Sequence, residues 1–127
     1  FTKGIYFEDV PYTTKALYNC KKLGVVKRIL YNYRFHKSSI TNSSSKKKID
    51  DSFTAHFMIK EFLEKQKVFD EYKNEFIIRL LTCCISPCFR DFLRMRENTR
   101  DKELKVFMAE VRNSNLLSIE NLSLLRN

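Results

Sequence analysis

Apolar residues recur every three or four positions through the second half of the chain, which is the spacing of one face of an α-helix. Each apolar run begins after a residue whose side chain can accept a hydrogen bond from the first turn of a helix. The pattern predicts helices over residues 51–67, 70–84, 86–98, 99–113 and 118–127. The capping residues are Asp51 or Ser52, Asp70, Ser86, Thr99 and Ser118, and Pro87 takes a first helical position.

The first half of the chain is less regular. Residues 1–11 alternate loosely between apolar and polar, which predicts an extended arm, and residues 12–24 predict a helix that Thr13 or Thr14 caps. Residues 25–36 fit a helical stripe and also the alternation of a strand. We expect a helix there, because a lone strand needs partners that the sequence does not show. The Ser- and Lys-rich residues 38–50 predict a solvated loop.

These elements together predict an all-α fold. We expect a single compact bundle of five to six helices with a short extended N-terminal arm and a Ser/Lys-rich loop. Only two glycines and two prolines occur, too few for the many tight turns of a β-sandwich or barrel. One domain spans 1–127, with a basic N-terminal region over residues 1–37, the loop 38–50 and a charge-neutral helical region over residues 51–127. Because the sequence begins with Phe, we expect a fragment of a larger protein.

The net charge of +9 bears on the function, because all of the excess positive charge lies in residues 1–48. This stretch holds 11 basic and two acidic residues, whereas residues 49–127 hold 13 of each. Such asymmetry predicts an anionic partner, either an acidic protein or a nucleic acid. The alternative is that the lysines only keep the protein surface hydrated and bind no partner. The candidate binding residues are Lys21, Lys22, Lys27, Arg28, Tyr31, Arg34, His36, Lys37, Lys46, Lys47 and Lys48.

The helix expected at 51–67 is apolar over a wide arc. Phe53, Phe57 and Met58 are therefore candidate protein-binding residues, since a groove of exposed Phe and Met can take an amphipathic helix. The alternative is that this helix is central and buried on both sides.

The four cysteines predict a reducing compartment rather than a disulfide scaffold, because Cys83, Cys84 and Cys88 cluster while Cys20 stands alone. Their spacing lacks the paired pattern of zinc sites, and we interpret Cys83 and Cys84 as small buried residues. Cys88 would lie near a helix N-terminus, where a thiol pKa falls. No catalytic constellation, metal site, cofactor motif or membrane-spanning run of about 20 apolar residues is present in the sequence.

We therefore expect a non-enzymatic interaction module of a larger intracellular, nuclear protein. It would bind a protein partner and use its basic face for an acidic protein or a nucleic acid. One alternative is a DNA- or RNA-binding domain that uses residues 21–48, and a second is a secreted basic helical ligand. The sequence sets neither the partner nor the oligomeric state, and it leaves residues 25–36 open between helix and strand.

Overall fold

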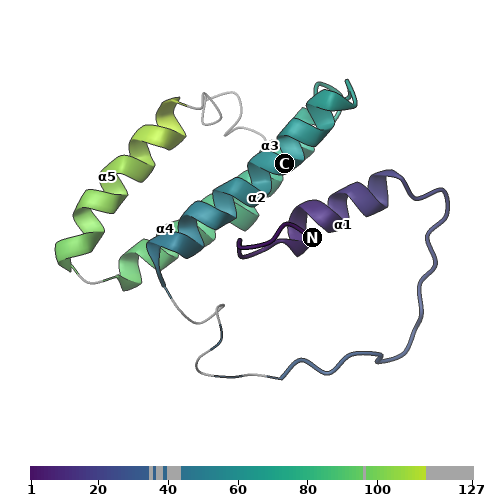
Figure 1. The fold of residues 1–127 in the computed structure, drawn as a ribbon, viewed down its shortest axis with the longest axis horizontal. Coiled ribbons are helices and arrows are strands. Elements are labelled where there is room, and N and C mark those ends of the chain that lie inside the picture. The colour runs from purple at the N-terminus through teal and green to yellow at the C-terminus, as the bar shows by residue number, and fades with distance from the viewer. Residues whose placement is uncertain (35, 37–38, 40–43, 96, 114–127) are drawn as a thin grey trace.

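The computed structural model describes residues 1–34, 36, 39, 44–95 and 97–113, the last without the side chains of 97–99, 110 and 113. These residues form four helical rods and no strand (Figure 1). The rods are α1 (Asp9–Tyr18), α2 (Lys46–Lys65), the continuous run of α3 (Lys73–Arg79), η2 (Leu80–Ile85) and α4 (Ser86–Arg94), and α5 (Glu97–Asn113). The all-α class is confirmed. The bundle of five to six helices is not confirmed, and the helix expected at 118–127 lies outside the described residues.

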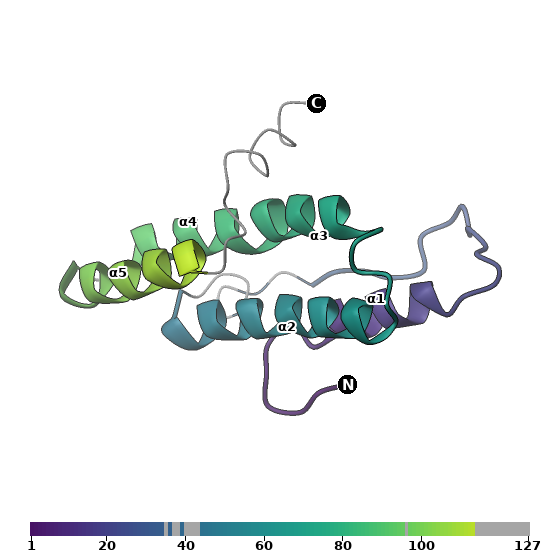
Figure 2. The same ribbon diagram turned by 90° about the horizontal axis from the view of Figure 1, so that it is seen from above.

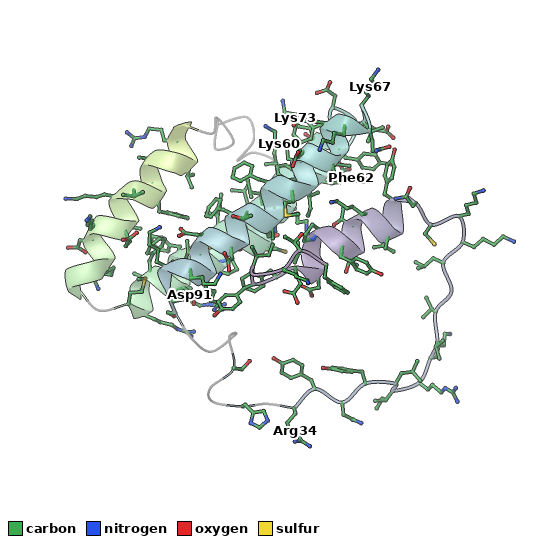
Figure 3. All side chains as sticks on the ribbon, in the orientation of Figure 1. Arg34, Lys60, Phe62, Lys67, Lys73 and Asp91 are labelled. Carbon is green, nitrogen blue, oxygen red and sulfur yellow. The ribbon has the colours of Figure 1, made fainter. Side chains whose placement is uncertain are left out.

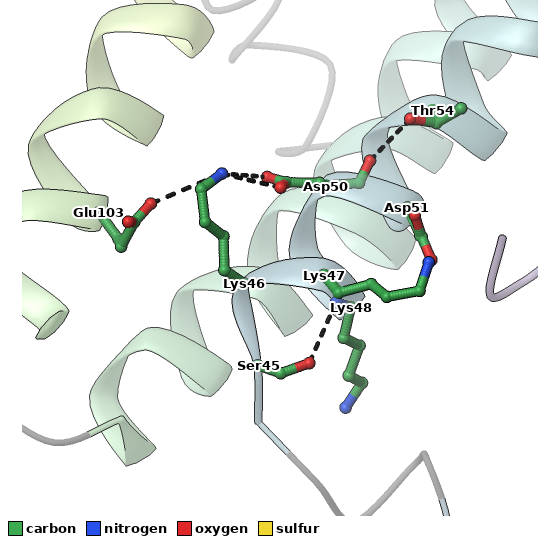
Figure 4. Close-up of polar contacts among 8 residues, drawn as sticks. All are labelled: Ser45, Lys46, Lys47, Lys48, Asp50, Asp51, Thr54 and Glu103. Atoms are coloured by element: carbon green, nitrogen blue, oxygen red, sulfur yellow. Dashed lines mark hydrogen bonds and ion pairs between the residues drawn. The ribbon is translucent and has the colours of Figure 1, made fainter. Parts of the chain in front are cut away.

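The helix α2 begins five residues earlier than its predicted start. Ser45 has an extended backbone, and its hydroxyl accepts a hydrogen bond from the Lys48 N–H at 3.2 Å, which caps the first turn (Figure 4). Asp51 and Ser52 lie inside the helix. The prediction of a loop through residue 50 is therefore wrong for 46–50. Ion pairs four residues apart, from Lys46 to Asp50 and from Lys47 to Asp51, stabilise this turn.

The predicted break between two helices at Ser86 and Pro87 does not occur. Ser86 is helical, with φ −61° and ψ −47°, and therefore does not cap a new helix. A proline in an α-helix clashes with the carbonyl four residues before it. The rod passes Pro87 because η2 is a π-helix with a wider turn, in which the Ser86 N–H donates to the Leu81 carbonyl five residues back.

The core lies between α2 and the α3–η2–α4 rod, which run side by side (Figures 1 and 2). α5 closes one end of the core through Phe107, whose ring meets those of Phe92 and Phe53 edge-on at 4.8 and 5.4 Å between centroids. None of the described helices is both long enough and apolar enough to cross a membrane. The buried apolar residues are Ile49, Ala55, Ile59, Leu63, Phe76, Ile77, Leu80, Leu81, Cys84, Cys88, Phe92, Phe107 and Val111.

The N-terminal segment differs from the predicted arm and helix. α1 begins at Asp9, and Pro11 is buried in its first turn, where a missing N–H is tolerated. Thr14 does not cap the helix, because its hydroxyl donates back to the Val10 carbonyl at 3.0 Å. Residues 1–8 form turns that are tied to α2, since the Tyr6 N–H donates to Asp51 Oδ2 at 2.8 Å. α1 also ends early, at Tyr18, and Gly24 lies beyond it.

Candidate functional site

The largest departure from the predicted fold is the run from Cys20 to Arg34, which we call the basic segment. It contains neither helix nor strand, so neither interpretation of residues 25–34 holds, and every residue in it is exposed. The ribbon leaves α1, runs away from the helices and returns toward α2 (Figure 1). One local bond stabilises its start, where the Cys20 thiol donates to the Lys22 carbonyl at 2.7 Å.

The basic segment brings together five of the predicted binding cations and carries no acidic residue. Figure 3 shows Arg34 pointing away from the helices. Within the residues that the structure describes, no carboxylate pairs with these cations. Their charge is therefore available to an external partner. The five are Lys21, Lys22, Lys27, Arg28 and Arg34.

The same segment exposes large apolar side chains. Five of them are aliphatic and two are tyrosines, and each is between 59% and 86% exposed. Burying one such aliphatic side chain contributes about 1.5–3 kcal/mol, so a partner that covers several of them gains substantially. Few soluble proteins leave so many apolar residues uncovered in one place. They are Leu23, Val25, Val26, Ile29, Leu30, Tyr31 and Tyr33.

The predicted Lys46–Lys48 cations do not belong to this surface. They form the first turn of α2, and each forms an ion pair with a carboxylate of the chain, as Figure 4 shows for Lys46. Lys46 pairs with Asp50 at 2.7 Å and with Glu103 at 3.6 Å, and Lys47 pairs with Asp51 at 2.6 Å. Lys48 is buried against Asp91. Of the other predicted residues, His36 is exposed and Lys37 lies outside the described residues.

The predicted protein-binding residues on α2 are only partly exposed. Phe53 is half-buried between Phe57 and Phe107, with ring centroids 6.2 and 5.4 Å away. Phe57 is 39% exposed, and Met58 is half-buried, with its sulfur 4.0 Å from the Thr2 hydroxyl. Of the three, Phe53 packs against the core, and Phe57 is the most exposed.

Sequence reasoning missed a buried polar cluster between α2 and α4. Lys48 Nζ lies 2.8 Å from Asp91 Oδ2, and the two side chains are 8% and 4% exposed. The Ser52 hydroxyl donates to Cys84 Sγ at 3.4 Å, and His56 Nδ1 lies 2.8 Å from the Ser52 carbonyl. The detectable signal is a polar stripe, because Lys48, Ser52 and His56 follow one another at four-residue intervals within an apolar helix face.

The cysteines lie differently from the prediction in two respects. Cys84 is buried as expected, but Cys83 is exposed. Cys88 is buried inside a continuous rod rather than near a helix N-terminus, so its pKa is not lowered. A shared hydrogen bond with Cys84, together with burial, raises the pKa of Cys88, and the same bond lowers the pKa of Cys84.

The described residues contain no group of three or more His, Cys, Asp or Glu side chains placed to hold a metal ion. Two candidate functional features remain, the basic segment and the polar cluster. Comparison of the chain with protein-family models, curated proteins and solved structures finds no match.

Proposed function

We propose that the chain is a non-enzymatic interaction module whose basic segment binds an acidic protein partner. The segment would lie along an apolar groove bordered by carboxylates. The observation that carries this proposal is that residues 20–34 combine unpaired cations with exposed aliphatic side chains. The four free cysteines are consistent with the reducing, intracellular compartment that the proposal includes.

The side-chain chemistry of the segment favours protein over nucleic acid. Unpaired bases stack chiefly on aromatic rings, and phosphates take cations, so a single-stranded nucleic acid makes less use of aliphatic side chains than an apolar groove does. Five of the exposed apolar residues of the basic segment, 20–34, are aliphatic, and Tyr31 and Tyr33 are its two aromatic residues. Burial against Asp91 also removes Lys48 from the nucleic-acid surface predicted over 21–48, and carboxylates four residues away pair with Lys46 and Lys47. An apolar groove on a protein would use the aliphatic residues that a nucleic acid leaves exposed.

The energetics predict a modest affinity with fast association. Burying the five aliphatic side chains gains roughly 7–15 kcal/mol, but ordering the backbone of a segment without regular structure offsets much of that gain. The five cations steer an acidic partner toward the segment and raise the association rate. Affinity should then depend on apolar burial, and rate should depend on charge.

Fluorescence anisotropy of the full chain against three labelled probes tests the proposal. The first probe is an amphipathic acidic helical peptide with a leucine stripe, the second is the same peptide with glutamine in place of leucine, and the third is a single-stranded oligonucleotide. We expect the leucine peptide to bind tightest and to keep most of its affinity at about 0.5 M salt, because apolar burial is not screened. Tightest binding of the oligonucleotide, with a steep salt dependence, would instead favour the nucleic-acid alternative.

A matched pair of variants locates the binding. Replacing Ile29 and Leu30 by serine should weaken the leucine peptide at least about tenfold, since each lost apolar contact contributes more than about 1 kcal/mol. Leu93→Ser removes a side chain that is 59% exposed on α4 and should leave binding unchanged. Equal affinity of both variants, or no binding of any probe by the unaltered chain, contradicts the proposal.

A further inference from the structure

An open depression follows one face of α2, and we call it the α2 trough. Its volume is about 700 Å³, and its lining residues run along the helix from Lys46 to Glu64. α5 borders the first half, because Lys46 lies 3.6 Å from Glu103 and the Phe53 ring lies 5.4 Å from that of Phe107. A helix rises by about 1.5 Å per residue, so the trough is roughly 27 Å long. An extended chain of about eight residues, at about 3.3 Å each, has this length.

The lining of the α2 trough places an apolar centre between acidic ends. Asp50 lies toward its start, Phe57 at its middle, and Glu61 and Glu64 toward its end. The three acidic side chains are between 50% and 64% exposed, and Phe57 is 39% exposed. Each carboxylate pairs with a lysine four residues away, and two of these lysines also line the trough. Such exposed pairs contribute little to stability, so the carboxylates remain open to the cations of a partner.

The basic segment carries the complementary order of side chains. Lys21 comes first, Leu23 and Val25 follow, and Lys27 comes last. In an extended chain these four alternate residues project from the same side of the backbone. Leu23 and Val25 are 75% and 81% exposed. One side of residues 21–27 therefore presents an apolar centre between two cations.

The lengths of the two patterns agree. Lys21 and Lys27 are six positions apart, which spans roughly 20 Å in an extended chain. Asp50 and Glu64 are 14 positions apart on α2, which spans roughly 21 Å in a helix. When the cations meet the acidic ends of the trough, the apolar side chains between them therefore fall on Phe57.

We propose that the partner of the basic segment is a second copy of this chain, whose α2 trough receives residues 21–27 in an extended conformation. This inference rests on the function proposed for the segment and names its partner. The acidic surface of that partner is then local, since the whole chain carries +9. The chain's own segment lies on the other side of α1 from α2 (Figure 1).

Reciprocal exchange would close the assembly as a dimer. Each copy has one segment and one trough, so two copies related by a two-fold axis use both. The two chains repel each other through their net charge, but about 0.15 M salt screens this repulsion beyond about 8 Å. The matched cations and carboxylates meet at contact distance and are screened much less. Association should therefore be measurable near physiological salt.

Sedimentation equilibrium of the full chain over a range of concentrations tests the proposal. The mass should rise from that of one chain, 15.2 kDa, toward twice that value as the concentration increases. Lys21→Glu with Lys27→Glu should weaken association at least about tenfold, because each copy then presents acidic residues to an acidic trough. Lys102→Glu with Lys105→Glu makes the same change of net charge at exposed positions of α5 and should not weaken it.

Mixing two variants tests whether the segment of one copy meets the trough of another. Glu61→Lys with Glu64→Lys alters the trough and leaves the segment intact, so this variant alone should also associate at least about tenfold more weakly. An equal mixture with the Lys21→Glu, Lys27→Glu variant should form a mixed dimer, because one intact segment then meets one intact trough. This recovery also shows that both variants fold. A mixture that associates no better than its components overturns the proposal.

The failure of this inference differs from the failure of the proposed function. A chain that stays monomeric at every concentration overturns the dimer. If the leucine peptide still binds residues 20–34 in that case, the proposed function stands and the partner is another protein. If neither the peptide nor a second copy binds, both proposals fail. A dimer that the segment and trough variants leave equally tight uses a different surface and also overturns the assignment.

Discussion

Three consecutive lysines at 46–48 take very different environments. Lys46 and Lys47 keep about half of their side-chain surface in water, whereas Lys48 is 8% exposed and pairs with Asp91 across to α4. Removing two charges from water opposes folding, and the close pairing offsets that penalty only while both partners are present. Asp91 is further stabilised by Ser44, whose hydroxyl donates to Oδ1 at 3.2 Å.

Asp91→Ala should lower the free energy of unfolding by about 3–5 kcal/mol, because it leaves the Lys48 ammonium buried without its counter-charge. Chemical denaturation followed by circular dichroism measures this loss. The double variant Lys48→Met with Asp91→Leu should recover most of it, since no charge is then buried. Lys65→Ala breaks an exposed ion pair with Glu61 and should change the denaturation midpoint little. A single variant at Asp91 as stable as the unaltered chain contradicts the buried pair.

At the scale of single residues, the sequence showed which residues are apolar but not which polar residues are buried. Asp91 follows Lys48 by 43 positions, so no local spacing joins them. The Lys triplet has the composition of a solvated run, and only the capping hydroxyl of Ser45, which starts α2 early, turns Lys48 toward α4. Charge alone therefore did not show that each of the three cations pairs with a carboxylate of the fold, or that Lys48 is buried.

Among the elements, the α3–η2–α4 rod shows where helical periodicity fails. An α-helical stripe through Phe76 and Leu80 predicts Cys83 as the next inward residue, yet Cys84 is buried and Cys83 is exposed. Leu80, Cys84 and Cys88 instead follow one another inward at intervals of four through η2 and into α4. A proline signalled the end of a helix, and the π turn that accommodates it has no sequence signature of its own.

The N-terminal segment is attached to α2 through Asp51. The carboxylate accepts hydrogen bonds from the Tyr6 N–H at 2.8 Å and from Lys47 Nζ at 2.6 Å, and Lys47 Nζ also donates to the Gly4 carbonyl at 2.8 Å. Burial by itself raises the pKa of Asp51, but these hydrogen bonds outweigh it and hold the pKa below its ordinary value. The contact therefore depends on ionised Asp51.

Acid should release this segment. Because the pKa of Asp51 is lower in the folded chain, its stabilisation is complete above the ordinary pKa of about 3.9 and is lost as the pH falls through the lower folded value. The NMR shift of the Tyr6 amide should report that titration, and in Asp51→Asn it should not titrate. The Gln66 amide, which donates to the Phe62 carbonyl, serves as the internal control. A Tyr6 amide that titrates at or above the ordinary pKa of an aspartate is the contrary result.

On the scale of the whole molecule, the helices form a folded unit and the basic segment lies outside it. α1 is held to α2 by contacts rather than by the chain that joins them, with the Tyr18 and Phe62 rings edge-on at 5.2 Å and Lys15 lying 5.7 Å over the Phe62 ring. Composition predicted the location of the charge correctly. It did not predict the irregular backbone of residues 25–34, because their apolar spacing fits a helical stripe as well as the alternation of a strand.

Limited trypsin digestion should cut first at Lys27 and Arg28, since proteases take exposed backbone without regular structure. The nicked chain should keep its helical circular dichroism and elute as one species, with α1 still bound. Lys46–Lys48 should resist at the same enzyme concentration, because they lie in a helix. First cleavage within α2, or loss of helical signal after the first cut, contradicts this arrangement.

The wide turn of η2 also sets which length changes the rod tolerates. A π turn is equivalent to an α-helix with a residue inserted. Deleting the exposed Thr82 would relax η2 toward α-helix and keep Phe76 and Phe92 on one face. A deletion within α3 or α4 would instead rotate everything beyond it by about 100° and carry apolar residues into water. We therefore expect single-residue deletions to be tolerated at 80–85 far more readily than anywhere else along the rod.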